Sequence, residues 1–141
     1  MEFDVTELRL LEETEEVEIE TVVSASRERH RTPVWAVVVG PHVYVRSVNG
    51  LQGHWHQHLR NHPQGAIHAE DKRIPVRAES VSDQKLLHQV SEAYMSKYVQ
   101  YPQDVAWIIS PPIVATTVRL VRELESAESA QSAAGCPRTL Q

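Results

Sequence analysis

The chain has 141 residues, which fits one domain, and its single cysteine excludes a disulfide scaffold or a cysteine-rich zinc site. Its formal net charge of −5 argues against general binding to nucleic acids or anionic membranes. No apolar run approaches the ~18 residues that cross a bilayer, and the first residues lack the basic and apolar regions of a secretory signal. We therefore expect a cytoplasmic protein that binds neither nucleic acid nor membrane.

In chain order, residues 4–14 carry apolar side chains at helical spacing, which predicts a helix. Residues 16–23 alternate apolar and acidic side chains, which predicts a half-buried strand. Residues 33–39 form a nearly continuous β-branched run, and the Gly40-Pro41 turn joins them to residues 42–48, so these two strands form a predicted hairpin. A short helix is then expected over residues 53–62, ended by Pro63.

In the second half of the chain, two short strands are predicted at residues 66–69 and 73–79, followed by the most regular helix at 83–98. Residues 104–109 are expected to be extended and residues 113–124 to form the last strand. About six strands that mostly follow one another directly, with two or three helices, favour an α+β fold built on a small antiparallel barrel. The barrel domain would span residues 1–125, and residues 126–141, rich in Ser, Ala and Gln, are predicted to be a disordered tail.

The charge pattern changes sign after residue 20. Residues 1–20 contain nine acidic residues and one basic residue, whereas Arg27, Arg29 and Arg31 follow within a short segment. Guanidinium groups bind phosphate through paired N–H donors, so this basic run is a candidate anion site. A solvated charged surface is the alternative interpretation.

Four short motifs occur in a distinctive order: Pro33-Val34-Trp35, Tyr44-Val45-Arg46-Ser47, Gly50-Leu51-Gln52-Gly53-His54-Trp55 and Ala93-Tyr94-Met95-Ser96-Lys97-Tyr98. Residues 31–77 resemble the split β-barrel proteins that bind FMN or deazaflavin cofactors, and the four motifs, which are the signature of one bacterial family of that fold, extend the likeness over roughly residues 27–122. The chain is similar to the deazaflavin-dependent nitroreductases of that superfamily, and more closely to a small, functionally unassigned bacterial family of the same fold. The resemblance implies a homodimer whose cofactor lies across the interface.

The resemblance also implies a set of cofactor contacts. The phosphate would meet Arg31, Thr32, Ser47, Asn49 and the backbone of Gly50, and the ring would pass over the backbone of Val34 and Trp35. Pro33 and Trp55 are also expected cofactor contacts. This chain departs from the superfamily pattern at Val48, where relatives have a basic residue, and at residues 24–29, which contain no glycine. These departures keep open the alternative that the fold is retained without the cofactor.

Candidate acid–base groups come from two clusters. His54 and His58 are one helical turn apart, a spacing that can bind a metal, but no cysteine or acidic third ligand is near, so we predict no metal site. Imidazole titrates near neutral pH, and His54 lies beside the expected ring position, so His54 is a candidate catalytic group. The resemblance gives Tyr98 a similar catalytic role, with Tyr94 and Lys97 at the substrate, whereas buried structural tyrosines are the alternative.

The resulting hypothesis is an FMN- or deazaflavin-dependent oxidoreductase that acts on a small organic metabolite. A cofactor-independent isomerase, cyclase or dehydratase, such as those of natural-product biosynthesis, is one alternative on the same scaffold. A non-catalytic ligand-binding protein is the other.

Overall fold

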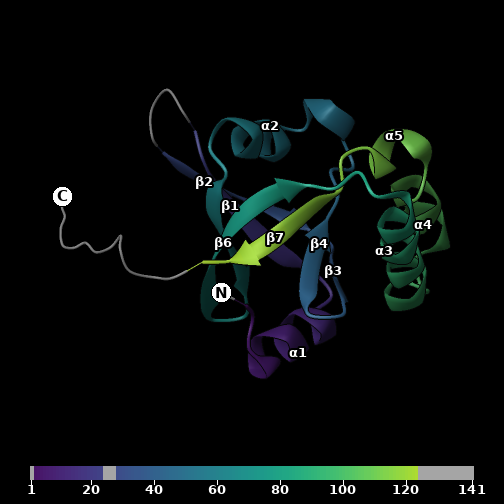
Figure 1. Cartoon of the computed structure of the whole chain (residues 1–141), viewed down its shortest axis with the longest axis horizontal. Helices are drawn as coiled ribbons and strands as arrows, with labels where there is room; N and C mark the ends of the chain where they lie inside the picture. The colour runs from purple at the N-terminus through teal and green to yellow at the C-terminus, as the bar shows by residue number, and fades with distance from the viewer. Residues whose placement is uncertain (1, 24–27, 124–141) are drawn as a thin grey trace.

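One curled, antiparallel sheet of seven strands forms the centre of the computed structural model, which describes residues 2–23 and 28–123 (Figure 1). The strands are β1 (Val17–Val22), β2 (Arg29–Val34), β3 (Ala36–Val39), β4 (His42–Val45), β5 (Gln64–Ala69), β6 (Lys72–Ser80) and β7 (Val118–Arg122). Their order in the sheet is β2-β1-β5-β6-β7-β4-β3, and every neighbouring pair is antiparallel. The sheet confirms the predicted split-barrel fold.

Trp35 explains why the sheet curls. The strands on either side of it, β2 and β3, lie at opposite edges of the sheet, yet this single residue joins them along the chain. One residue spans less than 4 Å, so the two edges must approach each other at Trp35. The barrel is therefore split next to Trp35, where β2 pairs only with β1 and β3 pairs only with β4.

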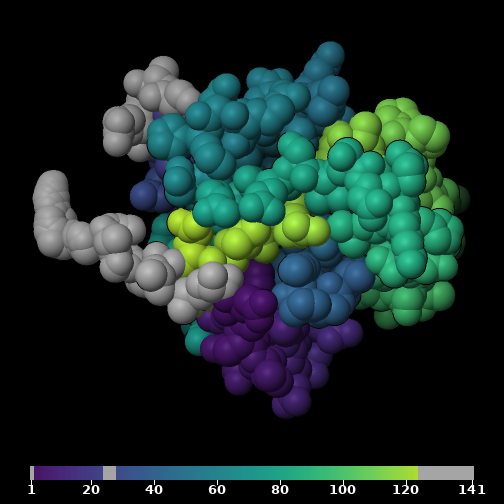
Figure 2. All heavy atoms as spheres, in the orientation of Figure 1, coloured from purple at the N-terminus to yellow at the C-terminus, as the bar shows by residue number. Residues whose placement is uncertain are grey.

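Five α-helices and one 3₁₀-helix surround the sheet in the described part of the chain. They are α1 (Val5–Glu13), η1 (Gly50–Gln52), α2 (His54–Asn61), α3 (Gln84–Lys97), α4 (Pro102–Ile108) and α5 (Pro111–Val114). Helix α2 packs on β1, whereas α1 and α3 pack on β3, and Figure 1 shows α3, α4 and α5 grouped together beside the β3–β4 hairpin. In Figure 2 this hairpin lies between α1 and α3, with β7 alongside it.

Two hydrophobic cores result from this arrangement. The larger core fills the space between the sheet, α1 and α2, and includes Val34 and Trp55. The second core lies between the β3–β4 hairpin and the helices α3, α4 and α5, and Trp35 packs against it. The split in the barrel therefore lies where the two cores meet.

Three predicted segments differ from the structure. The single strand expected over residues 33–39 is broken at Trp35, because the chain changes from one sheet edge to the other there. The extended segment expected at 104–109 is wrong: it belongs to α4, which Pro102 begins and whose buried Val105 and Ile108 are at helical spacing. The last strand was expected from residue 113, but Pro111 starts the short helix α5 and the strand begins at Val118.

Candidate functional site

A pocket of about 530 Å³ opens at the split of the barrel. We call it the tryptophan pocket, because all three tryptophans of the chain, Trp35, Trp55 and Trp107, line it. Its other lining residues are Glu16, Thr32, Pro33, Val34, Arg46, Val48, Asn49, Asp104 and Ile108. The lining comes from the loop before β1, the end of β2 with Trp35, the segment after β4, α2 and α4, so segments distant in the sequence build one site.

Tyr94 of α3 and Tyr98, the C-cap residue of α3, support the first wall of the tryptophan pocket. The indole of Trp35 stacks on the ring of Tyr98, and the Tyr94 hydroxyl donates a hydrogen bond of 2.7 Å to the Trp35 carbonyl oxygen. The backbone and the ring of Trp35 are thus both held in place by side chains that do not line the pocket. A fixed indole can present a flat face to a ligand without losing conformational freedom on binding.

Trp107 forms a second, more exposed wall. It lies on α4 and is 51% exposed, but its indole Nε1–H donates a hydrogen bond of 2.8 Å to the carbonyl oxygen of Val48. This contact joins α4 to the turn after β4. The indole is therefore an accessible apolar surface at a defined position.

The turn after β4 is built by Ser47, Gly50 and Gly53. The Ser47 hydroxyl donates to the Gly50 carbonyl oxygen at 2.8 Å, and Gly50 has a φ of +69°, a left-handed conformation that favours glycine. A Cβ at Gly53 would overlap the Ser47 Oγ, so glycine is required there too. The turn directs Asn49 into the pocket lining.

A second cavity of about 470 Å³, which we call the side pocket, adjoins the tryptophan pocket. The two share Thr32, Asn49 and Trp55, and the side pocket adds Gln52, Gly53 and His54. One compartment is therefore rich in indole rings, and the other is lined mainly by neutral polar groups and one imidazole.

The charged groups of the tryptophan pocket are arranged by depth. Arg46 is only 1% exposed, and burial lowers the pKa of its guanidinium, whereas Glu16 and Asp104 are exposed. Among the described lining residues, the one arginine is thus buried and both acids are at the surface.

Residues 7–120 match a protein family described as uncharacterized and conserved in bacteria, DUF2255. The chain belongs to the DUF2255 family. No curated protein matches the sequence of this DUF2255 protein.

Solved structures share the fold of the DUF2255 protein at low identity. An F420-H2-dependent reductase is 15% identical, with a TM-score of 0.57 over 76% of this chain and 93% of the other. HutZ, a heme storage protein from Vibrio cholerae, is 15% identical, with a TM-score of 0.64 over 88% and 92%. A 5-nitroimidazole antibiotic resistance protein from Bacteroides thetaiotaomicron is 12% identical, with a TM-score of 0.63 over 86% and 81%. The functions of these proteins differ, so the likeness establishes the split-barrel fold alone.

The structure of the DUF2255 protein brings most of the expected cofactor residues together. Thr32, Pro33, Val34, Trp35, Asn49 and Trp55 line the tryptophan pocket, and His54 lines the side pocket. Ser47 and Gly50 shape the turn beside it. Arg31 is outside both linings, and its Nε donates to the carboxylate of Glu18 at 2.7 Å.

The α3 residues expected at the substrate lie behind the pocket wall instead. The Tyr98 hydroxyl donates to the carbonyl oxygens of Glu15 and Ala36, and the Lys97 ammonium donates to those of Leu11 and Ala36. Burial raises the pKa values of Tyr94 and Tyr98 above the usual range and lowers the pKa of Lys97 to about 8. None of the three lines either pocket, so they support Trp35 and the adjoining backbone.

The arginines around residue 29 and the histidines have other partners. Arg29 pairs with the buried Glu20, and Arg27 is outside the described residues. His58 Nδ1 shares a hydrogen bond of 3.0 Å with the Thr21 hydroxyl. Within residues 2–23 and 28–123, no group of three or more histidine, cysteine or acidic residues is arranged to hold a metal, and no helix is long and apolar enough to span a bilayer.

Sequence reasoning missed the pocket roles of Arg46, Trp107 and the two acids. Asp104 and Trp107 belong to a segment expected to be extended, and its helical spacing of Val105 and Ile108 was the available signal. Arg46 lies in a strand motif with no sequence feature that distinguishes a buried arginine from a surface one. Its role depends on where α3 and α4 pack.

Proposed function

We propose that this DUF2255 protein is an FMN- or deazaflavin-dependent oxidoreductase that acts on a small organic metabolite. The observation that carries the proposal is the tryptophan pocket, which adjoins a polar side pocket at the split of the barrel. A flavin-type cofactor has the same division, with a conjugated ring joined to a hydroxylated chain that ends in phosphate.

The tryptophan pocket fits the ring. Its volume of about 530 Å³ is within the range of roughly 300–1,000 Å³ that small-molecule sites occupy. Indole rings stack favourably on conjugated rings, and Trp35 is already held flat by Tyr98. Val34 and Pro33 add apolar contacts at the end of β2.

The side pocket fits the polar chain of such a cofactor. The Thr32 hydroxyl and the amides of Asn49 and Gln52 can hydrogen-bond to hydroxyl groups and phosphate oxygens. No lysine or arginine is among its described lining residues, so the imidazole of His54 would be the nitrogen base available to the phosphate there. Arg31, next to Thr32, would reach a phosphate only by leaving Glu18.

A bound flavin or deazaflavin would supply the hydride transfer. The protein would orient the ring between Trp35 and Trp107 and exclude water from its faces. His54 would hold or release the accompanying proton, because a neutral imidazole accepts a proton and an imidazolium donates one.

We also propose that the protein is a homodimer whose partner covers the mouth of the pocket. Three large apolar side chains around the turn and α4, Val48, Leu51 and Trp107, are each about half exposed, at 50%, 52% and 51%. Exposed apolar clusters of this kind mark association surfaces. Sedimentation at micromolar concentration should give a dimer, and Leu51→Lys should shift it towards monomer.

Cofactor binding tests the proposed function. The purified protein is titrated with FMN and with a deazaflavin coenzyme, and the change in cofactor fluorescence is measured. We expect saturable binding of at least one, weakened about tenfold or more in the Thr32→Val, Asn49→Ala double variant, which loses two hydrogen-bonding groups. Gln89→Ala, on the exposed face of α3, is the matched control. If neither cofactor binds at high concentration, the redox function is excluded.

One observation favours a second function on the same site. The side pocket lacks a described lysine or arginine, and Val48 stands where relatives have a basic residue, so the phosphate has few partners. A cofactor-independent enzyme or a ligand-binding protein needs the tryptophan pocket alone. If small aromatic compounds bind while both cofactors fail, this second function replaces the first.

A further inference from the structure

Arg46 is a buried cation with no acidic partner among residues 2–23 and 28–123. Its Nε donates to the Thr117 hydroxyl at 2.8 Å, and Nη1 donates to the Ser91 hydroxyl at 2.9 Å and to the Ile108 carbonyl oxygen at 3.2 Å. Nη2 donates to the Leu87 carbonyl oxygen at 3.0 Å. All four acceptors are neutral, and no carboxylate of the described chain lies within ion-pair distance.

These contacts only partly offset the burial of a full charge. Removing an ion of this size from water costs several kcal/mol even after the protein relaxes, on the order of what one good ion pair returns. The carbonyl oxygen of Ile108 is at the C-terminus of α4, where the helix dipole favours a cation. A guanidinium has five N–H groups, and the four hydrogen bonds leave one on Nη2 without a partner in the described structure.

The charge of Arg46 lies next to the tryptophan pocket, although the residue is only 1% exposed. Arg46 is part of the lining of the tryptophan pocket, and its guanidinium is otherwise enclosed by α3, α4 and the segment before β7. An anionic group entering the pocket would be attracted strongly, because few solvent dipoles screen a charge in such a place. Within residues 2–23 and 28–123, no other arginine or lysine belongs to the lining.

The mouth of the tryptophan pocket has the opposite charge. Glu16, in the loop before β1, and Asp104, on α4, are exposed and both belong to the lining. A second negative group on a ligand would be placed near these carboxylates and repelled by them. The pocket is thus positive at its floor and negative at its mouth.

We propose that the tryptophan pocket selects conjugated rings that carry one anionic group, with that group directed inward to Arg46. This inference rests on the proposed function, in which the pocket binds a conjugated ring. The ligand class is a conjugated mono-anion, such as an aromatic carboxylate, phenolate or enolate. Arg46 is the specificity-determining residue for the anion, and Glu16 with Asp104 exclude rings that carry a second anion at the outer end.

Three probes of one ring size test this selectivity: 2-naphthoate, its neutral analogue 2-naphthamide, and 2,6-naphthalenedicarboxylate, which has a second carboxylate at the far end. Each is titrated into ¹⁵N-labelled protein, and dissociation constants are taken from the shifts of the three indole N–H signals, all of which report on the pocket. We expect 2-naphthoate to bind about tenfold more tightly than the amide, because the buried charge attracts an anion with little screening, and the dicarboxylate to bind more weakly than 2-naphthoate.

Variants assign the selectivity to its residues. Arg46→Met should abolish the preference for 2-naphthoate over the amide, and Arg46→Lys should retain part of it. Arg77→Met, which removes a surface arginine paired with Glu79 and Glu123, should leave the preference unchanged. The Glu16→Gln, Asp104→Asn double variant should bind the dicarboxylate and 2-naphthoate about equally.

The affinities of the wild-type protein for the three probes test the proposal even if the Arg46→Met variant does not fold. Equal or tighter binding of the amide by the wild type would overturn the proposal, and so would indole signals that none of the probes shifts. Failure of the proposed oxidoreductase is a different result, in which neither FMN nor the deazaflavin coenzyme binds while the naphthalene series still shows its charge preference.

Discussion

The indole of Trp35 lies flat on the phenol ring of Tyr98, with the ring centroids 3.9 Å apart and the planes 1° from parallel. Tyr98 is itself fixed, because it is 1% exposed and its hydroxyl donates to the Glu15 carbonyl oxygen at 2.6 Å. The residue that joins the two edges of the sheet is therefore held by a residue of α3. This relationship links the stability of the fold to the shape of the pocket.

The Tyr98→Phe variant should distinguish the contribution of the Tyr98 hydroxyl from that of its aromatic ring. We expect Tyr98→Phe to lower the free energy of unfolding by about 1 kcal/mol, because the partly buried carbonyl oxygen of Glu15 loses its donor while that of Ala36 keeps its hydrogen bond from Lys97. The affinity of the protein for a ligand with a conjugated ring should change by less than about twofold, because a phenyl ring still stacks on Trp35. Urea unfolding and a ligand titration measure the two effects.

Tyr98→Ala is the matched variant, since it removes the stack as well and should weaken ring binding. If Tyr98→Phe instead abolished turnover with affinity and fold intact, the hydroxyl would have the catalytic role that the family resemblance suggests.

Trp107 should contribute to binding more than to stability. It is half exposed, so Trp107→Leu should cost little free energy of unfolding, about 1 kcal/mol or less. The same variant removes an aromatic wall of the tryptophan pocket, and we expect ring affinity to fall about tenfold. Trp107→Phe should recover most of the affinity although it lacks the Nε1–H bond to Val48. Thermal melting followed by titration separates the two quantities, and a large loss of stability without loss of affinity would contradict the assignment.

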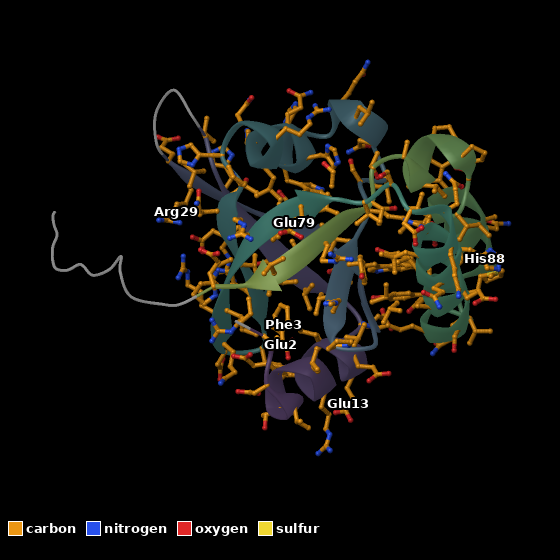
Figure 3. All side chains as sticks on the ribbon, in the orientation of Figure 1. Glu2, Phe3, Glu13, Arg29, Glu79 and His88 are labelled. Atoms are coloured by element: carbon orange, nitrogen blue, oxygen red, sulfur yellow. The ribbon has the colours of Figure 1, made fainter. Side chains whose placement is uncertain are left out.

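The carboxylate of Glu20 should make the fold sensitive to acid. Glu20 lies on β1 with a 6% exposed side chain and contacts Arg29, which Figure 3 labels at the sheet edge, together with Arg73 and His68. Burial alone would raise the pKa of Glu20, but hydrogen bonds and charges from these partners outweigh it and hold the pKa at about 2.

Since the pKa of Glu20 is about 4.5 when unperturbed, its contribution to stability is complete above that pH and is lost as the pH falls towards 2. The loss should be on the order of 3 kcal/mol, at about 1.4 kcal/mol for each pH unit between the two pKa values. Urea unfolding between pH 6 and 2 should show this slope in the wild type and a flatter profile in Glu20→Gln. Glu18→Gln, whose ion pair with Arg31 is exposed, should retain the wild-type slope.

Gly53 should be intolerant of a methyl group for steric reasons. A Cβ there would overlap the Ser47 Oγ, which donates the hydrogen bond that closes the turn. Gly53→Ala should therefore lower stability by about 1–3 kcal/mol and weaken ligand binding through displacement of Asn49. Gly40→Ala is the control, because its Cβ would meet nothing within 4 Å and only the φ of +60° is unfavourable, at about 1 kcal/mol. Circular dichroism melts and ligand titrations measure the stability and the ligand affinity of both variants. An unchanged ligand affinity in Gly53→Ala would show that the turn does not contribute to the binding site.

Local patterns predicted most of the elements, because burial on one face imposes a period on the sequence. The glutamates that alternate with Val17 and Ile19 predicted β1, and the spacing of Leu87, Val90 and Tyr94 predicted α3. The same reasoning failed at α4, where apolar residues suggested an extended segment although Pro102 and Asp104 are typical of a helix start. Residues 126–141, the predicted tail, lie outside the described residues.

The sequence by itself determined most of the strands, the glycine turn after β4 and the family pattern, because each depends on neighbours within a few residues; the strand β2 and its break from β3 at Trp35 were not predicted. Only the tertiary structure decided which side chains face one another. The packing of α3 against β3 turned Tyr94, Lys97 and Tyr98 away from the pocket, and the packing of α4 brought Trp107 to it. Arg46 became a buried, unpaired charge for the same reason, since the groups that surround a side chain come from segments 41–71 residues away along the chain.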